Sequence, residues 1–302
     1  MSRSGSAPAR IGRREHCQLC GTDGGSSVRF PVQSNVRCFS QDRFPVWRCP
    51  GCSSIHSLDR VPLDPYYASY PIHERELSRA GRLVFRRYLR RIRRHGIGPQ
   101  TRILDYGCGS GQLLDYLREQ GYDRVHGYDP YMEQWSDPGV LRQRYGLVLA
   151  QDVLEHVEDP QQLLNRLHDL LQPGGLLVIG TPRAESICLR RAGEFVHSLH
   201  QPYHLHILSE KQLRAMLTGL GHQLLSVSRR HLYDTWWPML NWNFLTALAR
   251  RRDNTLDAFF EPAPPGWFLS PGLWLRALFG YLRPCPGEML LISRKPPDKE
   301  TV

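Results

Sequence analysis

The spacing of apolar and polar residues predicts alternating strands and helices in the middle of the chain. The apolar run in "TRILDY" predicts a strand that leads into a glycine-rich turn, and a helical pattern then extends from about Gln112 to Gln120. Gly121 ends this helix, and "RVHGYDP" predicts a second strand that ends in Asp129. A strand, a glycine turn, a helix and a second strand in this order predict an α/β fold.

A longer amphipathic pattern covers residues 76–98, before the first predicted strand. Its apolar side chains share one broad face, arginines occupy the rest of the surface, and Gly96 ends the helix. Two interpretations of the arginine face remain open: it is solvated while the apolar face packs on the sheet, or it binds phosphate groups. The apolar face includes Leu77, Leu83, Val84, Tyr88 and Ile92.

Composition limits the classes of protein to which the chain can belong. Its 302 residues, 41% of them apolar, are enough for one large domain with one or two small ones. The sequence has no apolar run long enough to span a membrane and no N-terminal signal segment. We therefore expect a cytoplasmic protein whose residues 1–16 form a disordered basic tail. The net charge of +10 suits binding to nucleic acid, acidic lipid or an anionic substrate, and equally a solvated basic surface.

Four of the eight cysteines form two Cys-x2-Cys pairs, Cys17 with Cys20 and Cys49 with Cys52. Two such pairs separated by 28 residues are typical of a zinc site, whereas Cys38 is an alternative ligand with poorer spacing. The strand-like segments between the pairs are too short to be stable by core burial alone, so bound metal would supply folding free energy. Since four thiolates fill a tetrahedral site, we predict a structural Zn²⁺ without catalysis. Disulfides are the alternative, which a cytoplasmic location disfavours.

Three glycines at every second position, Gly107, Gly109 and Gly111, follow the first predicted strand, and Asp105 lies two residues before them. Together with Asp129 they form a unit that binds a dinucleotide or nucleoside, whose ribose hydroxyls donate to the terminal acid. A pyrophosphate would lie close to the Asp105 carboxylate, and the repulsion of like charges disfavours it. A cofactor with a cationic end reverses the sign. S-adenosylmethionine carries a sulfonium and an ammonium group and has no phosphate.

With these features the chain resembles the class I S-adenosylmethionine-dependent methyltransferases. Residues 146–182, "GLVLAQDVLEHVEDPQQLLNRLHDLLQPGGLLVIGTP", look like that family's fourth strand, following helix and fifth strand, with Val153–Val157 opening the helix. "QLLSVSRRH" and "GEMLLISRKP" look like its last two strands, an antiparallel pair. The resemblance implies a Rossmann-like sheet with helices on both faces and a site at the carboxyl ends of the strands. The implied cofactor-binding residues are Asp105, Gly107, Gly109, Gly111, Asp129 and Asp152.

Two features distinguish the chain within this family. Between Asp129 and Gly146 the sequence is short, so the third strand is expected to be shortened or missing, and Tyr128, Tyr131 or Trp135 would cover the adenine ring. The cysteine module ahead of the core resembles small-molecule methyltransferases with an N-terminal zinc-binding domain. Sugar C-methyltransferase-like members, which act on nucleotide-linked deoxysugars, are among these.

The segment "HQPYHLHILS", residues 200–209, supplies the candidate general bases. Its His200, His204 and His206 follow the predicted fifth strand, and family members often carry a similar segment before a helix, which here starts at Ser209. An unperturbed imidazole titrates near neutral pH, which suits proton removal from an oxygen or carbon acceptor. We predict His204 as the favoured base. The alternative is that these side chains only pack or form local hydrogen bonds.

Residues 231–283 form an insert between the last two predicted strands and contain five of the seven tryptophans. In "PGLWLRALFGYLRP", Leu, Trp and Phe are interleaved with Arg276 and Arg283, which suits an interfacial helix on a bilayer. A lid over an apolar substrate, which we slightly prefer, and a dimer surface are also compatible with this pattern. The prolines at 262, 264 and 265 predict an irregular link between two short helices.

The sequence therefore predicts transfer of a methyl group from S-adenosylmethionine to an oxygen or carbon of a small molecule, such as a sugar or an apolar, lipid-linked metabolite. An RNA methyltransferase that grips phosphates with the zinc module and the basic helix is one alternative. The Asn/Asp-Pro-Pro-Tyr motif that serves the amino groups of bases is absent after the fourth strand, which disfavours nucleic acid as a partner. A non-catalytic cofactor-binding module is the other alternative.

The predicted organisation is a tail at 1–16, a zinc-binding module at 17–62, a linker and basic helix at 63–100, a methyltransferase domain at 101–295 and a tail at 296–302.

Overall fold

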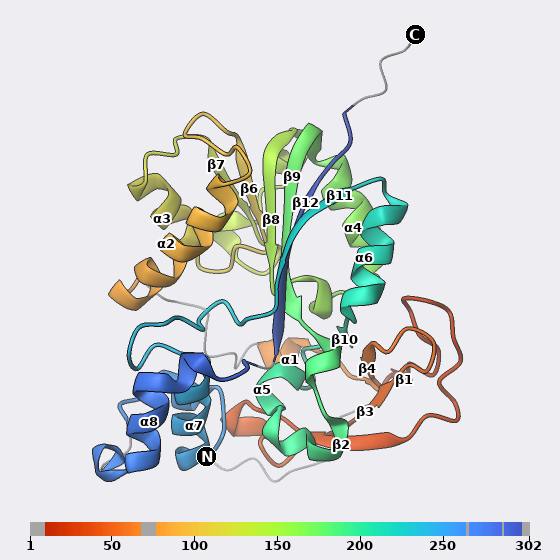
Figure 1. Ribbon diagram of the computed structural model, residues 1–302. Helices are drawn as coiled ribbons and strands as arrows, with labels where there is room; N and C mark the ends of the chain where they lie inside the picture. Colours follow the sequence, from red (N-terminus) through yellow and green to blue (C-terminus); the bar gives the residue numbers. More distant parts are fainter. Residues whose placement is uncertain (1–9, 68–76, 264–265, 286, 298–302) are drawn as a thin grey trace. The chain divides into compact units, whose positions relative to one another are not determined.

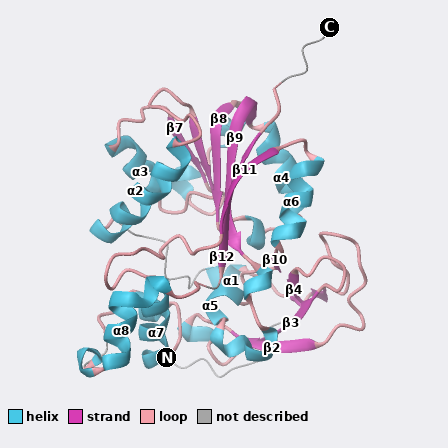
Figure 2. Ribbon diagram, viewed as in Figure 1, coloured by secondary structure: helices cyan, strands magenta, loops and turns pink. Residues whose placement is uncertain are grey.

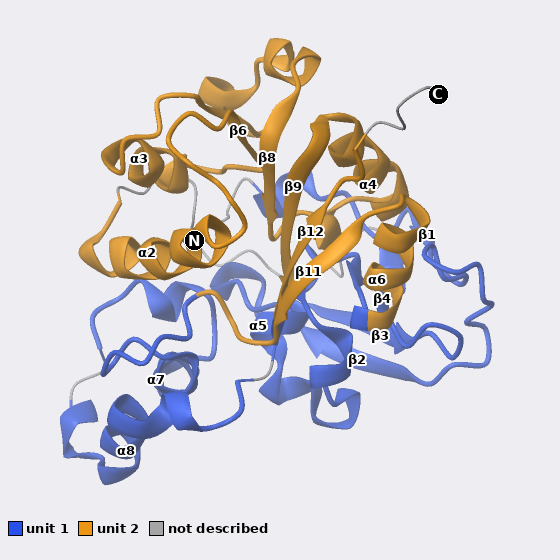
Figure 3. Ribbon diagram, turned by 45° about the horizontal axis from the view of Figure 1, so that its top comes forward, with its two compact units in different colours: residues 1–71, 182–210, 233–288 blue, residues 72–181, 211–232, 289–302 orange. Residues whose placement is uncertain are grey.

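The computed structural model describes residues 10–67, 77–263, 266–285 and 287–297. The chain forms two compact units, each made of three separate stretches (Figure 3). The cysteine module, the histidine segment and most of the insert belong to the first unit, and the glycine loop belongs to the second. The first unit comprises residues 1–71, 182–210 and 233–288, and the second comprises residues 72–181, 211–232 and 289–302.

The second unit is built on a mostly parallel sheet, which confirms the predicted α/β fold (Figure 1). The strand order among the described residues is β11-β12-β9-β8-β6-β7, and the strands from β9 to β7 are parallel. β11 and β12 are the antiparallel pair that the sequence predicts. The strands are β6 Ile103–Tyr106, β7 Val125–Tyr128, β8 Tyr145–Gln151, β9 Leu171–Pro182, β11 Gln223–Ser228 and β12 Glu288–Arg294.

Helices cover both faces of this sheet, with α2 and α3 on one side and α4 and α6 on the other (Figure 2). α2 begins where the Ser78 hydroxyl accepts a hydrogen bond from the Gly81 amide at 3.0 Å, and it buries the apolar face that the sequence indicates. α3 follows directly after Gly111, as predicted. The helices are α2 Arg79–Arg93, α3 Gln112–Glu119, α4 Pro160–Asp169 and α6 Glu210–Gly219.

Residues 129–144, between β7 and β8, confirm the predicted loss of the third strand. They form two 3-10 turns, Glu133–Trp135 (η2) and Pro138–Arg142 (η3), and contain no strand. β7 is consequently the edge of the sheet in the part of the chain that the structure describes.

The predicted helix start at Val153–Val157 is wrong. Leu154–His156 is a separate 3-10 turn (η4), and α4 begins only at Pro160. The reason is local, because the Asp159 carboxylate accepts a hydrogen bond from the Gln162 amide at 2.9 Å and so caps the helix there.

The first unit contains two small sheets. One has the order β10-β4-β3-β2, in which β10 of the histidine segment pairs antiparallel with β4 of the cysteine module. In the other, β1 pairs with β5, and Arg14 is buried, so residues 10–16 are part of the module; residues 1–9 lie outside the described residues. The elements are β1 Gly12–Arg13, β2 Arg29–Gln33, η1 Arg37–Phe39, β3 Arg43–Arg48, β4 Ile55–Ser57, β5 Asp59–Arg60, α1 Asp64–Tyr67 and β10 His206–Ile207.

The described residues of the insert contain two short helices, as predicted, whereas Pro264 and Pro265 of the predicted irregular link lie outside the described residues. Asn241 caps α7 by accepting from the Phe244 amide at 2.9 Å, and its own amide group donates to the Arg276 carbonyl of α8 at 3.0 Å. None of the helices in the described residues is long and apolar enough to cross a membrane. The elements of this part of the first unit are η5 Ala184–Ser186, η6 Leu189–Glu194, α5 Val196–Leu199, α7 Trp242–Arg252, η7 Asp257–Phe259, η8 Trp267–Leu269, α8 Pro271–Phe279 and η9 Gly280–Leu282.

Candidate cofactor site and cysteine cluster

The carboxyl ends of the parallel strands bring three acidic side chains to one edge of the sheet. Asp105 on β6 pairs in register with Gly127 of β7 and with Leu149 of β8. Asp129 follows β7 directly, and Asp152 follows β8 directly. In open α/β sheets this edge is where ligands bind. The structure therefore assembles the predicted acidic residues at one place, although their roles toward a cofactor stay predictions.

The glycine loop lies at the same edge and has a backbone that requires glycine. Gly107, Gly109 and Gly111 all have positive φ, at 76°, 53° and 81°. A Cβ atom at Gly107 would lie 2.4 Å from Cγ2 of Val153, and a Cβ atom at Gly111 would lie 2.8 Å from the Trp135 ring. The loop is thus constrained both by its turn and by close packing.

Asp105 is a buried carboxyl group without an ion-pair partner among the described residues. Desolvation, together with the nearby charge of Asp129, raises the pKa of Asp105 to about 7. Burial thus favours the neutral form of this carboxyl group up to a much higher pH than usual. A cation placed beside this carboxyl would favour its ionised form.

Helix α2 supplies one more candidate site residue, which the sequence pattern does not reveal. Tyr88 of α2 is fully buried, and burial together with the charges of Asp105 and Asp152 holds the pKa of its hydroxyl well above the usual range. The Tyr88 hydroxyl has no hydrogen-bond partner within the described residues. A buried hydroxyl group that is influenced by two carboxylate charges and has no partner among the described residues fits a site for a polar ligand. In the sequence, Tyr88 looks like any other residue of an apolar face.

Asp129 holds the glycine loop in place. Its Oδ2 accepts from the Gly109 amide at 3.0 Å, and its Oδ1 accepts from the Tyr131 amide at 2.9 Å. Trp135 packs against the loop, and its buried indole N–H has no hydrogen-bond partner in the part of the chain that the structure describes. Of the three aromatic residues proposed for the adenine ring, Trp135 has its ring beside Gly111, the Tyr128 carbonyl accepts from the Gly107 amide at 2.7 Å, and Tyr131 is exposed.

The end of β8 is shaped by an unusual backbone and a buried pair. Asp152 has a φ of 54°, in the left-handed region that non-glycine residues rarely adopt, and it is exposed. The Thr181 hydroxyl at the end of β9 donates to a carboxylate oxygen of Glu155 at 3.0 Å, and both side chains are fully buried. The pair joins the turn after β8 to the end of β9.

In the first unit, the four predicted cysteines meet in one cluster. The Sγ atoms of Cys17 and Cys52 are 3.5 Å apart, as are those of Cys20 and Cys49, and all four lie within 4.8 Å of one another. A tetrahedral Zn²⁺ with Zn–S bonds of about 2.3 Å requires sulfur atoms about 3.8 Å apart, so the cluster fits this ion. Cys38 is exposed and is not in the cluster.

The two cysteine pairs have the same backbone structure. The Cys17 carbonyl accepts from the Gly21 amide at 2.9 Å, and the Cys49 carbonyl accepts from the Ser53 amide at 3.0 Å. Gly21 and Ser53 occupy equivalent positions with φ of 75° and 65°. The second pair thus forces a serine into a conformation that glycine adopts without strain.

The three candidate histidines lie close together in sequence but in different environments. His206 is buried beside His56, with 3.0 Å between their Nδ1 atoms, and Nε2 of His56 lies 3.1 Å from Sγ of Cys17. His200 stacks on Tyr203, and its Nδ1 lies 2.7 Å from Asn35 Oδ1. Nδ1 of His204 donates to the Ser198 carbonyl at 2.9 Å. His206 therefore belongs to the surroundings of the cysteine cluster, and the role of His200 or His204 as a base stays a prediction.

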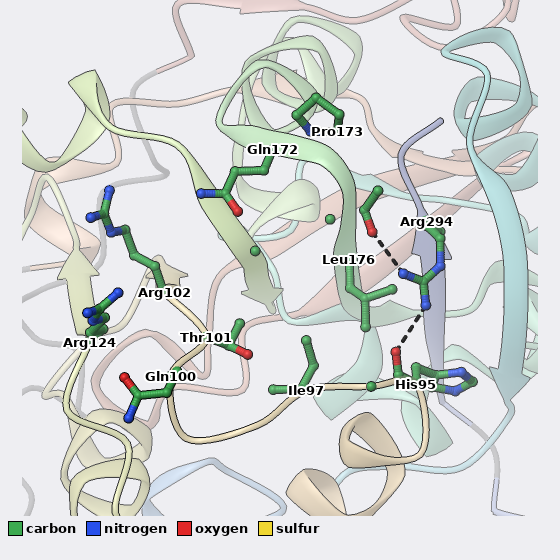
Figure 4. A pocket seen from close by; sticks show the side chains of 14 residues that line it. His95, Ile97, Gln100, Thr101, Arg102, Arg124, Gln172, Pro173, Leu176 and Arg294 are labelled. Atoms are coloured by element: carbon green, nitrogen blue, oxygen red, sulfur yellow. Dashed lines mark hydrogen bonds between the residues drawn. The ribbon is translucent and has the colours of Figure 1, made fainter. Parts of the chain in front are cut away.

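A cavity of about 390 Å³ lies at the opposite edge of the same sheet (Figure 4). Arg102 and Arg124, which immediately precede β6 and β7, line one side of it. On the other side the Arg294 guanidinium donates to the carbonyls of Gly174 and His95 at 2.8 and 3.0 Å. Because it borders the amino ends of the strands, this cavity is separate from the candidate cofactor site.

Several known proteins similar to this chain are named as methyltransferases. Ubiquinone biosynthesis O-methyltransferase of Bradyrhizobium diazoefficiens is 30% identical over 141 residues, which cover 39% of this chain and 55% of that protein. The chain thus spans about half the length of this relative. Among solved structures, a SAM-dependent methyltransferase from Archaeoglobus fulgidus is 18% identical with a TM-score of 0.43, covering 71% of this chain and 94% of that one. N-methyltransferase NodS from Bradyrhizobium japonicum, in complex with S-adenosylhomocysteine, is 16% identical with a TM-score of 0.39, covering 72% and 89%.

A family model described as a methyltransferase domain matches residues 77–227, which is half of the chain. The matched region runs from α2 to β11 and includes the glycine loop and all three strand-terminal acids. The resemblance to the methyltransferase family is confirmed. The chain belongs to the methyltransferase domain family, with the Rossmann-like α/β fold of the class I, S-adenosylmethionine-dependent members.

Proposed function

We propose that the protein transfers the methyl group of S-adenosylmethionine to an oxygen or carbon atom of a small molecule, such as a sugar or an apolar, lipid-linked metabolite. The observation that carries this proposal is the buried Asp105 beside a glycine loop, together with the family match over residues 77–227. An oxygen acceptor is the first choice, because the relative with 30% identity is named as an O-methyltransferase.

The residues at the carboxyl edge fit the cofactor. Asp105 would hold the ammonium group, and the glycines would allow the backbone to approach the ligand closely. Both oxygens of Asp129 already accept from backbone amides, so ribose hydroxyls would use its remaining lone pairs. Tyr88 and Trp135 offer two buried donors that lack a partner in the described chain. The bound cofactor would supply an electrophilic methyl group, and alignment of the acceptor would contribute much of the acceleration.

His204 is the proposed base for removing the acceptor proton. Since a carbonyl oxygen only accepts, the hydrogen bond to Ser198 places the imidazole proton on Nδ1 and the lone pair on Nε2. Replacement of His204 by Gln keeps a donor but removes the base, and we expect it to lower kcat about a hundredfold or more with an unchanged affinity for the cofactor. An unchanged kcat would assign His204 to packing.

We also propose that the cysteine cluster binds one structural Zn²⁺ through Cys17, Cys20, Cys49 and Cys52. Four thiolates leave no open position, so this ion would contribute to folding only. His56 supports the assignment: with Cys17 as a thiolate, Nε2 of His56 would donate to the sulfur, and Nδ1 would accept from His206.

The activity is tested with S-adenosylmethionine carrying a labelled methyl group and a panel of phenols, sugars, lipids and RNA. We expect calorimetric binding of the cofactor and label in an organic small molecule. Label in RNA, with binding that falls steeply as salt rises, would support the nucleic-acid alternative instead. Failure to bind the cofactor would reject methyl transfer and leave a non-catalytic module.

A further inference from the structure

Helix α8 of the insert has two apolar faces rather than one. Its inner face places Leu273 and Ala277 in a cluster with Phe244 and Ala247 of α7, and all four side chains are buried. A surface helix normally turns polar residues outward on the opposite side. In α8 and the turn that follows it, the outward side is also apolar.

The outward face follows helical spacing. Leu275, Leu278, Phe279 and Leu282 occur at positions i, i+3, i+4 and i+7, and they are 61%, 47%, 54% and 77% exposed. Phe268 and Leu269, just before the helix, and Trp274 within it are exposed as well. Of the large apolar side chains exposed in the described residues, only Ile11, Val28 and Tyr131 lie outside the insert. The exposure is thus concentrated in the insert, and seven of these side chains lie in α8 and the turns on either side of it, as at a binding surface.

The charges of the segment that carries this face have a single sign. From Pro262 to Gly287 the sequence has no acidic residue and two arginines, Arg276 and Arg283. The acids of the neighbouring segment are engaged elsewhere in the first unit: Asp253 and Glu261 pair with Arg37, and Asp234 accepts from the Trp242 amide. An apolar stripe with a tryptophan and flanking arginines, but no acids, complements the interface of an anionic bilayer, where apolar side chains reach the acyl region and arginines contact headgroups.

We propose that the outward face of α8 docks the protein on the surface of an anionic lipid bilayer. A lid or a second copy of the chain would need only the apolar stripe, whereas the bilayer also accounts for the arginines and for the absence of acids. The proposal does not depend on the proposed activity, because it concerns binding to lipid alone.

The test is sedimentation of the full-length, metal-loaded protein with vesicles of phosphatidylcholine and phosphatidylglycerol in equal parts. We expect binding at low salt, with a blue shift of tryptophan fluorescence as Trp274 enters the interface. A variant with Leu275→Gln, Leu278→Gln and Phe279→Gln should bind at least about tenfold more weakly, because the inserted area is lost. The matched control, Ile11→Gln with Val28→Gln, removes equally exposed apolar side chains elsewhere and should bind as the parent does.

A second variant separates the contribution of charge. Arg276→Gln with Arg283→Gln should weaken binding to the anionic vesicles about fivefold per arginine, and should change binding to phosphatidylcholine vesicles much less. The proposal is overturned if the parent does not bind anionic vesicles, or if the triple glutamine variant binds as tightly as the parent. It is also overturned if light scattering shows a dimer that only the triple variant loses, since the face would then belong to a second copy.

Discussion

The cysteine cluster and the glycine-loop site are both built around side chains that become negative on ionisation, but the fold prepares them in opposite ways. The four cysteines come from two short turns with matching hydrogen bonds, and their sulfur atoms already lie at distances that suit a metal ion. At the sheet edge, Asp105, Asp129 and Asp152 come from the ends of different strands, and Asp105 is buried without a countercharge among the described residues.

Two different kinds of structural feature support the two proposed ligands. The cysteine cluster does so by geometry, because four donors converge on one point. At the Asp105 site the support is energetic. Burial of a carboxyl group that has no ion-pair partner among the described residues raises its pKa and makes its ionisation cost free energy. A cationic ligand removes that cost on binding, so the electrostatic penalty in the free protein favours binding. The predictions below separate these two cases.

The largest expected effect is on the cysteine cluster. Structural zinc contributes on the order of 10 kcal/mol in small modules, so Cys52→Ala should abolish stoichiometric metal binding and expose the module to protease. Metal analysis and limited proteolysis measure this. Cys188→Ala removes an exposed cysteine of the same unit and should change neither. If the Cys52 variant retains one metal ion per chain and its protease resistance, the cluster is not a metal site.

The second effect is the pH dependence that Asp105 adds to stability. Its pKa rises from the ordinary value of 3.8 to about 7 on folding, so between these values the folded state binds more protons than the unfolded one. The stabilising contribution of the protonated form is therefore present at low pH and is lost as the pH rises toward 7. Between pH 5 and 7 this amounts to about 2 kcal/mol. In the Asp105→Asn variant, the free energy of unfolding should not decrease in this way between pH 5 and 7.

Denaturant unfolding of the cofactor-free protein at a series of pH values measures the difference between the parent and Asp105→Asn. Asp115→Asn, an exposed residue of α3 paired with Arg118, is the matched control and should follow the parent. A difference between parent and Asp105→Asn that does not change with pH would mean that Asp105 has an ordinary pKa.

The smallest effect concerns the two cysteine turns. Because Ser53 has the left-handed φ that glycine has at the equivalent position 21, Ser53→Gly should stabilise the metal-loaded protein by about 0.5 kcal/mol or slightly more. The reciprocal change Gly21→Ser should destabilise it by a similar amount. Thermal melts show whether each variant has a higher or a lower melting temperature than the parent. A change in the same direction for both variants would show that the two turns are not equivalent.

The sequence reveals the sites whose residues are close together in the chain. The Cys-x2-Cys spacing predicts the cluster, and the alternate glycines with Asp105 and Asp129 predict the loop and its edge, since strand ends coincide in a parallel sheet. The absence of the third strand is predicted from the length of the segment between β7 and β8, because residues 129–144 are too few for a helix and a further strand. The helix start after β8 is not predicted correctly, since the Asp159 cap overrides the apolar pattern at Val153–Val157.

Contacts between distant segments are not predictable in this way. β10 has two residues and pairs with β4 150 residues earlier, which places His206 beside His56 and the cysteine cluster. No local pattern shows this pairing. Tyr88 looks like a core residue, because only the assembled sheet shows that its hydroxyl lies near carboxylates. The outward stripe of α8 is visible as spacing, but the sequence does not show which of its two apolar faces α7 covers.

The most direct test of the central claim is whether cofactor binding releases a proton from Asp105. Calorimetric titration with S-adenosylmethionine near pH 6, in buffers with different ionisation enthalpies, measures this number. At that pH the raised pKa keeps most of the free protein's Asp105 protonated and the cofactor's amino group is already an ammonium, so pairing of the two predicts release of nearly one proton by the parent and none by Asp105→Asn. Binding by the parent near pH 6 without proton release would contradict the pairing of this carboxylate with a cationic ligand.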